Sequence, residues 1–294
     1  MIRKCLLSGL HSALLILTSL GGIAIYFPTS ELVTVPLPYP SLVSGAAVKP
    51  VAKAITVKII SKGFLGTGTL INKRDKIYTV ITNDHVLTAS EPTYEIQTPD
   101  GRIYLAEVSQ VVKFGDDDLG LLQFTTDQVY QIAAVSNSSA LTVGDEVFAS
   151  GFTGEAQDII FTHGHVSLLL DKSLEGGYQL GYTNDIHKGM SGGPIFNIQG
   201  EVVGINGLHN EPLWDAPDLY ADGSLPCQPL QEMITASSWA IPIEKVAQLA
   251  PNFVQLKLPQ LFILSLESKK HIDYTALQMR VKAATAKSCT LLRQ

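Results

Sequence analysis

Short apolar runs separated by glycine and polar turns make up most of the chain between residues 51 and 250. Many runs are rich in β-branched residues and alternate apolar with polar positions, which is typical of half-buried strands. They recur about every ten residues, a spacing that favours a barrel or sandwich. A polar break at 135–140 divides them into two series: 54–60, 66–72, 76–83, 95–99, 102–112 and 119–124, then 146–152, 158–170, 177–184, 193–199, 201–208 and 237–243. The pattern predicts an all-β domain over 51–250, with one barrel over about 51–134 and a second over about 135–250.

The strand pattern lapses twice near the end of this region. Residues 210–238 carry several prolines and acids, which indicates an inserted loop, and 230–234 within it are compatible with a short helix. A helical pattern over 244–250 follows the last predicted strand. The tail, 251–294, shows no strong period, and we assign it no role.

The first 30 residues start with Arg3 and Lys4 and continue with a long apolar run. A short basic region followed by an apolar segment is the order of a signal peptide or a signal anchor, and both alternatives remain open. We expect an N-terminal apolar helix here and a Pro-rich linker over 31–50. The body is then extracytoplasmic, either periplasmic or secreted, or attached to the inner membrane by residues 5–27.

The net charge of the chain limits the classes of molecule that it could bind. Asp and Glu number 27 against 21 Lys and Arg, giving a net charge of −6. Residues 31–250 hold 25 of the 27 acidic residues but only 12 of the 21 basic ones, so the body is more acidic than the whole chain. This argues against nucleic acid as a partner, because affinity for phosphate chains comes mainly from Lys and Arg. We expect no cofactor, and contact with a membrane only through the N-terminal segment.

The stretch GMSGGPIFN over 189–197 satisfies G-x-S-x-G, with Ser191 at its centre. That pattern marks the nucleophile of α/β-hydrolases, but Pro194 stands where such an enzyme needs a helix. A serine nucleophile also needs a base and an acid that orients the base. The best candidates are His85, at the end of an apolar strand, and Asp118, at the start of another.

Taken together, TNDHVLTAS, DDDLGLLQF, GMSGGPIFN, GEVVGING and WAIPI resemble the trypsin-like (chymotrypsin-fold, PA clan) serine endopeptidases. Within that class they are similar to the short bacterial forms close to the HtrA/Do proteases. The resemblance implies two six-stranded antiparallel β-barrels with the active site between them, and an endopeptidase that acts on polypeptides through an acyl-enzyme.

The resemblance also implies residue roles. Ser191 would be the nucleophile, His85 the general base and then acid, and Asp118 the orienting carboxylate. This chain order of His, Asp and Ser argues against an α/β-hydrolase. The backbone amides of Gly189 and Ser191 would form the oxyanion hole.

Two departures from related patterns change the expected behaviour. Met190 stands where many secreted relatives place an aspartate that pairs with a newly cut N-terminus, so we expect activity without propeptide cleavage. The segment after Ala250 is too short for the PDZ domain that usually follows HtrA-type proteases, so we expect none.

Three residues are candidates for substrate binding. Asp185 would form the floor of the primary specificity pocket and would favour Arg or Lys at the cleaved residue. Asn206 and Gly207 resemble the strand that lines the same pocket. We expect no metal site: His163 and His165 share a strand face but lack a third ligand.

A second acid adjoins His85, and a second class of protein is compatible with the same motifs. Asp84 adjoins His85 and could be mistaken for the triad acid, but we expect its side chain to face solvent. The protein could also be a catalytically silent trypsin-fold binding module that uses the 210–238 insertion to hold a partner.

Overall fold

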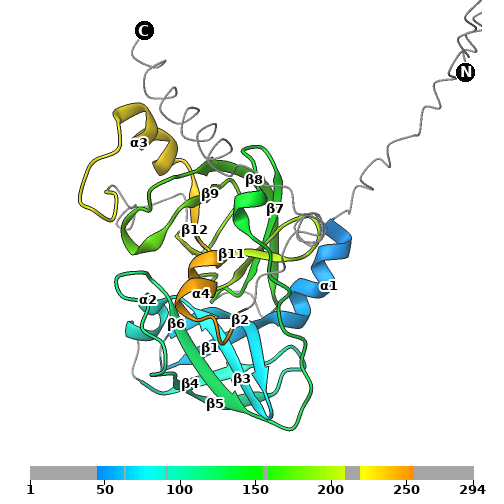
Figure 1. The fold of residues 1–294 in the computed structure, drawn as a ribbon. Helices are drawn as coiled ribbons and strands as arrows, with labels where there is room; N and C mark the ends of the chain where they lie inside the picture. The colour runs from blue at the N-terminus through cyan, green and yellow to red at the C-terminus, as the bar shows by residue number, and fades with distance from the viewer. Residues whose placement is uncertain (1–44, 63, 90–91, 155–157, 209–218, 255–294) are drawn as a thin grey trace, which may run out of the picture. The chain divides into compact units, whose positions relative to one another are not determined.

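The computed structural model describes residues 45–254, apart from 63, 90–91, 155–157 and 209–218 (Figure 1). The predicted signal or anchor segment, most of the expected linker, most of the tail and part of the 210–238 insertion lie outside the described residues. Within the described part of the chain, no helix is long and apolar enough to cross a membrane.

The first six strands form a closed antiparallel barrel in the order β1-β2-β3-β6-β5-β4. Period-two burial is clear in β4, where Tyr94 and Ile96 are buried while Glu95 and Gln97 are partly exposed, whereas β3 is buried along most of its length. The strands are β1 (Thr56–Ser61), β2 (Phe64–Arg74), β3 (Ile77–Thr82), β4 (Tyr94–Gln97), β5 (Ile103–Val108) and β6 (Gly120–Thr125).

The second six strands form another closed antiparallel barrel, in the order β10-β11-β12-β9-β8-β7. They are β7 (Glu146–Gly151), β8 (Ile160–Leu169), β9 (Leu180–Tyr182), β10 (Pro194–Phe196), β11 (Val202–Leu208) and β12 (Ser238–Pro242). Strands β1 and β2 contact β7, so the two barrels pack together (Figure 1). The prediction of two six-stranded antiparallel barrels is confirmed, and the architecture is chymotrypsin-like.

Short helices join or flank the strands. They are α2 (Asp84–Thr88), α3 (Gln228–Thr235) and α4 (Ile243–Leu249), with 3₁₀ turns at Ser138–Ala140 and Glu175–Gly177. Helices α3 and α4 lie where the sequence predicted them. Helix α4 follows β12 directly and contacts both β11 and β12.

The start of the folded body differs from the prediction. Helix α1 (Gly45–Ile55) occupies the end of the segment expected to be a linker and continues into the first expected strand. Its residues Val48, Ala52 and Ile55 are buried, and the helix contacts β7 and β8. These residues are four and three positions apart, which places them on one helix face. The prolines nearby obscured this short helical pattern.

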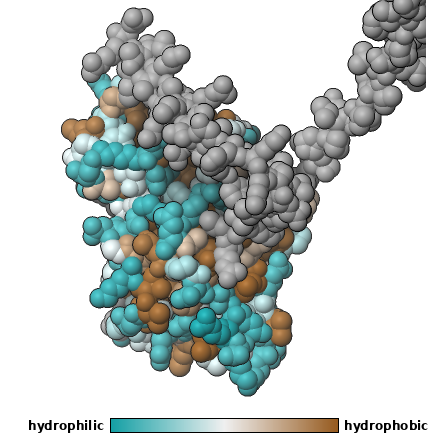
Figure 2. Space-filling view, viewed as in Figure 1, coloured by the Kyte–Doolittle hydropathy of each residue, from teal (hydrophilic) through white to brown (hydrophobic). Residues whose placement is uncertain are grey.

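Exposed apolar side chains are scattered over the surface. In Figure 2 hydrophobic residues are interspersed with hydrophilic ones over the first barrel. On β5, Leu105 and Ile103 have 74% and 53% of their surface exposed. Single exposed apolar residues are normal in soluble domains and identify no partner.

Candidate active site

His85 lies just beyond the end of β3, where the chain turns into α2. Asn83 at the helix N-cap is extended, and Val86 and Leu87 anchor the helix in the core of the first barrel. The amide of Asn83 donates to the backbone oxygen of Asp118 at 2.8 Å, which ties the two segments together. The His85 side chain remains 41% exposed. The strand end therefore presents an accessible imidazole on a fixed support.

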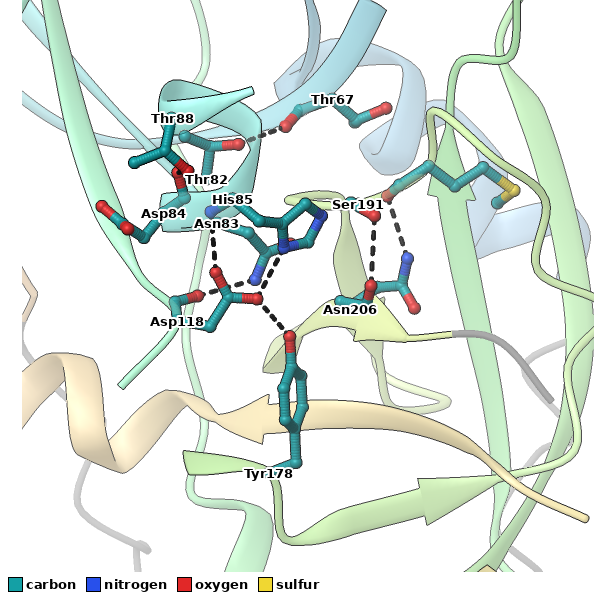
Figure 3. Close-up of polar contacts among 12 residues, drawn as sticks. Thr67, Thr82, Asn83, Asp84, His85, Thr88, Asp118, Tyr178, Ser191 and Asn206 are labelled. Atoms are coloured by element: carbon teal, nitrogen blue, oxygen red, sulfur yellow. Dashed lines mark hydrogen bonds and ion pairs between the residues drawn. The ribbon is translucent and has the colours of Figure 1, made fainter. Parts of the chain in front are cut away.

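Asp118 receives hydrogen bonds on both carboxylate oxygens (Figure 3). Its Oδ1 accepts from the backbone N–H of His85 at 2.9 Å, and its Oδ2 pairs with Nδ1 of the His85 ring at 2.7 Å. The phenol of Tyr178 donates a short hydrogen bond to the same Oδ2. Only 16% of the Asp118 side chain is exposed. This carboxylate is held so that it fixes both the position and the tautomer of the imidazole.

Opposing effects act on the pKa of Asp118. Burial is the largest single influence and raises the pKa, but hydrogen bonds and charge from His85, together with the Tyr178 hydrogen bond, outweigh it. The pKa of Asp118 is therefore lowered, and the group is ionised at neutral pH.

A prediction for stability follows from this lowered pKa. The ionised Asp118 stabilises the fold above the ordinary aspartate pKa of about 4, and this contribution is lost as the pH falls toward the lower pKa of the folded state. We expect the free energy of unfolding in urea to fall less between pH 7 and pH 3 in Asp118→Asn than in the wild type. An equal decrease in the free energy of unfolding between pH 7 and pH 3 in the two proteins would contradict this stabilising role of the ionised Asp118.

Asp84 provides a control of opposite sign. Burial, and next the charge of Asp118, raise the pKa of Asp84, while His85 lowers it less. A carboxyl whose folded pKa is raised favours folding at low pH, so Asp84→Asn should make the loss of stability on acidification steeper. The side chain of Asp84 is exposed, as the sequence predicted.

Ser191 lies on a tight loop between β9 and β10 that only glycine-rich sequence can form. Gly189 and Gly192 have φ values of 99° and 85°, in the left-handed region. A Cβ on Gly192 would also lie 2.1 Å from the backbone oxygen of Thr67. These two glycines are the first two of the G-x-S-G-G stretch, so the backbone conformation and close packing of the loop explain the motif.

Two amides of the loop have no hydrogen-bond acceptor among the described residues, and they are the two that the family resemblance assigns to an oxyanion hole. The N–H groups of Met190, Gly192 and Gly193 donate to backbone oxygens. Those of Gly189 and Ser191 donate to no group among the described residues. Unpaired backbone donors are uncommon in folded proteins, and two of them flanking one residue can bind a developing negative charge.

The hydroxyl of Ser191 donates to the backbone oxygen of Gly207 at 3.1 Å. In Figure 3 the ring of His85 lies between Asp118 and Ser191. The hydroxyl must turn away from Gly207 before it can donate to His85. Such an adjustment is usual, because catalytic hydrogen bonds in ligand-free structures are often poorly aligned.

Thr67 on β2 connects the first barrel to the Ser191 loop. Its Oγ1 donates to the backbone oxygen of Gly189 at 2.7 Å and accepts from the N–H of Phe152 at 2.8 Å, and its N–H donates to the oxygen of Ser191 at 3.0 Å. Sequence reasoning missed Thr67, because its partner Gly189 lies 122 positions away. The contact fixes the loop that carries Ser191.

We expect Thr67→Val to lower kcat for peptide hydrolysis about tenfold and to change KM little. The substitution keeps the shape of the side chain but leaves the buried oxygen of Gly189 and the partly buried N–H of Phe152 unpaired, each at a cost of about 1–3 kcal/mol. Steady-state kinetics and thermal melting test it. The control is Thr79→Val, on β3, where Thr79 accepts from the Gln123 amide at 3.3 Å. Equal kinetics in the two variants would contradict a role for Thr67 in the loop.

The prediction that Asp185 forms a pocket floor needs correction. Its side chain is 78% exposed and lies 3.3 Å from Nε2 of His187. The neighbouring Asn184 and Ile186 are buried, so the residue between them faces outward. The structure therefore provides no enclosed carboxylate at this position to select Arg or Lys.

The other two substrate-binding candidates lie beside Ser191. The buried amide of Asn206 donates to the oxygen of Met190 at 3.0 Å and accepts a short hydrogen bond from Tyr182, so its side chain supports the loop from behind. Gly207 contributes its backbone oxygen to Ser191.

The contacts of Met190, and those of the histidine pair on β8, are accounted for by packing in the second barrel. The Met190 side chain is fully buried in the core of the second barrel. It thus anchors the loop by apolar packing where an aspartate would need an ion pair. The rings of His163 and His165 lie 5.8 Å apart, and the described residues contain no group of three or more metal-ligating side chains.

Comparison with known families agrees with this geometry. Residues 66–205 match the trypsin-like peptidase domain family, a span that includes His85, Asp118 and Ser191. Together with the two barrels, this shows that the chain contains a trypsin-like peptidase domain. Its more particular relationship is to the HtrA and DegP serine proteases.

Curated relatives support that relationship. The chain is 34% identical over 145 residues to the periplasmic serine endoprotease DegP of Escherichia coli, covering 48% of this chain and 29% of the relative. It is 30% identical over 154 residues to the serine protease Do-like HtrA of Bacillus subtilis, covering 49% and 33%. It is 36% identical over 146 residues to the periplasmic pH-dependent serine endoprotease DegQ of E. coli, covering 48% and 30%. The matches span about a third of each relative.

Proposed function

We propose that the protein is an exported serine endopeptidase that hydrolyses peptide bonds of polypeptides through Ser191, His85 and Asp118. The observation that carries the proposal is the His85–Asp118 pair, because Asp118 accepts both the ring Nδ1–H and the backbone N–H of the same histidine. The N–H groups of Gly189 and Ser191, which donate to no described group, add a place for negative charge.

The chemistry follows from this arrangement. Ser191 Oγ attacks the peptide carbonyl carbon while Nε2 of His85 takes the hydroxyl proton, and the oxyanion is stabilised by the N–H groups of Gly189 and Ser191. The imidazolium, stabilised by Asp118, then gives its proton to the departing amine, which leaves an acyl-enzyme. Water, deprotonated by His85, releases the carboxylic acid and restores Ser191.

Export rests on two further observations. The relatives DegP and DegQ are periplasmic, and the chain starts with a basic and then apolar segment. We propose that the peptidase domain lies outside the cytoplasm, with residues 5–27 as a signal peptide or anchor. Fractionation of cells that express the full chain tests this, and recovery of the domain in the cytoplasm alone would contradict it.

The test of activity is digestion of casein and a mixed peptide library by the purified chain, with cleavage sites read by mass spectrometry. We expect cleavage by the wild type and none above background by His85→Ala. Equal products from both proteins would contradict the proposal. A silent binding module would bind polypeptides without cutting them; the described residues offer no observation that favours it, and residues 210–218 of its proposed binding segment lie outside them.

A further inference from the structure

We propose that Tyr178 is a positioning residue for the reaction, one that holds the Asp118 carboxylate from the opposite barrel in the orientation that His85 requires. This inference rests on the proposed endopeptidase function. It concerns a residue that lies outside the sequence motifs around His85, Asp118 and Ser191.

Tyr178 reaches the acid from the second barrel. It follows the 3₁₀ turn Glu175–Gly177 and precedes β9, and only 3% of its surface is exposed. Figure 3 shows its phenol pointing from the second barrel to Asp118, where the hydroxyl donates to Oδ2. The acid and base are carried by the first barrel, whereas Tyr178 and Ser191 are carried by the second.

The backbone around Tyr178 is fitted to the acidic loop. The N–H of Asp118 donates to the oxygen of Gly176 at 2.9 Å. A Cβ on Gly177 would lie 2.2 Å from Oδ1 of Asp117, and the same Oδ1 pairs with Nζ of Lys245 on α4 at 2.7 Å. The segment 176–178 and Lys245 therefore hold Asp117 and Asp118 together across the two barrels.

The Tyr178 hydroxyl occupies space that Gly207 leaves empty. A Cβ on Gly207 would lie 2.2 Å from that hydroxyl oxygen. The carbonyl of Gly207 is also the acceptor for Ser191 Oγ. Tyr178 thus lies between Asp118 and Gly207, the residue that contacts Ser191. A displacement of its ring would therefore change the positions of both Asp118 and Gly207.

The hydrogen bond has a clear chemical consequence. Oδ2 of Asp118 must face Nδ1 of His85 when the imidazole becomes positively charged. A second donor on this oxygen resists rotation of the carboxylate, and it favours the ionised form that stabilises the imidazolium. The Tyr178 hydroxyl is one of the contacts that lower the pKa of Asp118. Its effect should fall on kcat more than on KM, because the charge on His85 develops after substrate is bound.

The test is Tyr178→Phe in the full chain, which removes the hydroxyl and keeps the ring. We expect kcat for a peptide substrate to fall about tenfold while KM stays within about twofold. The matched control is Tyr78→Phe: Tyr78 is fully buried, its hydroxyl accepts from the N–H of Tyr130 at 2.9 Å, and it lies at the opposite end of β3 from His85. We expect the control to lower thermal stability and leave kcat within about twofold.

A double-mutant cycle with Asp118→Asn separates positioning from general support of the fold. If Tyr178 acts through the carboxylate, Tyr178→Phe should cause no further loss in the Asp118→Asn background. Inactivation rates with a fluorophosphonate probe extend the cycle to slow variants, and they do not depend on peptide turnover.

Three outcomes would overturn the role of Tyr178. They are an unchanged kcat in Tyr178→Phe, a loss of kcat equal to that of Tyr78→Phe, and a full tenfold loss in both the wild-type and the Asp118→Asn backgrounds. Each requires an active wild type. A wild type that neither cuts peptides nor reacts with the probe would instead contradict the proposed function.

Discussion

Ser191→Ala is expected to lower kcat for peptide hydrolysis about 10⁶-fold, the loss typical of removing the nucleophile from a triad. The hydroxyl is the only group that can form the acyl-enzyme in the proposed reaction. Its one hydrogen bond within the described part of the chain, to Gly207, is neutral and partly buried, so the free energy of unfolding should change by less than about 1.5 kcal/mol. Steady-state kinetics with a peptide found to be cut, together with urea unfolding, measures both quantities.

The control for this variant is Ser139→Ala. Ser139 is exposed, lies in the 3₁₀ turn Ser138–Ala140, and should tolerate the change with kcat and stability unaltered. Retention of more than about 1% of wild-type kcat in Ser191→Ala, with contaminating proteases excluded, would contradict nucleophilic catalysis by this residue.

Asp118→Asn is expected to lower kcat about 10⁴-fold near neutral pH. Asp118 accepts three hydrogen bonds, whereas an asparagine side chain has one oxygen and one NH₂ group. The backbone N–H of His85 cannot become an acceptor, so the amide oxygen should stay opposite it and the NH₂ should face the ring. Nδ1 of His85 must then lose its proton and Nε2 must carry one, and Nε2 can no longer accept the proton of Ser191.

Asp84→Asn is the matched control, because Asp84 is the exposed carboxylate next to His85 in the sequence. No hydrogen bond joins its side chain to another described residue, and we expect kcat within about threefold of the wild type. A similar loss of kcat in both variants would show that nearby negative charge matters and that orientation by Asp118 does not. Measurement of kcat and KM for both variants at pH 7 distinguishes these outcomes.

The strand pattern of the sequence predicted the fold closely. Each of the twelve apolar runs overlaps one strand. Burial alternates in strands such as β4, while β9, β10, β11 and β12 are buried at nearly every position and so read as continuous apolar runs. Helix α1 was missed because its buried face consists of only three residues next to several prolines. The high proline content of this segment favoured a linker, and three buried positions were too few to indicate a helix.

The candidate site was predicted in part. His85, Asp118 and Ser191 follow from short stretches of sequence, since each stands at a strand end or in a glycine-rich loop. Thr67 and Tyr178 carry no such signal, because their partners lie 122 and 60 positions away and in the other barrel. Their contacts exist only once the two barrels have packed together.

Asp185 shows why spacing alone is a poor guide to a pocket. Its distance from Ser191 in the sequence suggested a buried floor, but alternation between Asn184, Asp185 and Ile186 turns the carboxylate outward. Asp185 lies beyond the end of β9, so its orientation is set by the conformation of the segment before Ser191, which the spacing in the sequence does not give.

The most direct test of the account is reaction of the full chain with a fluorophosphonate probe, followed by peptide mapping by mass spectrometry. We expect one covalent adduct per chain, located on Ser191, that is absent in Ser191→Ala and forms far more slowly in Asp118→Asn. Only a serine activated by a base and placed beside an oxyanion hole reacts readily with such a probe. Labelling of the wild type no greater than that of Ser191→Ala would contradict the central claim.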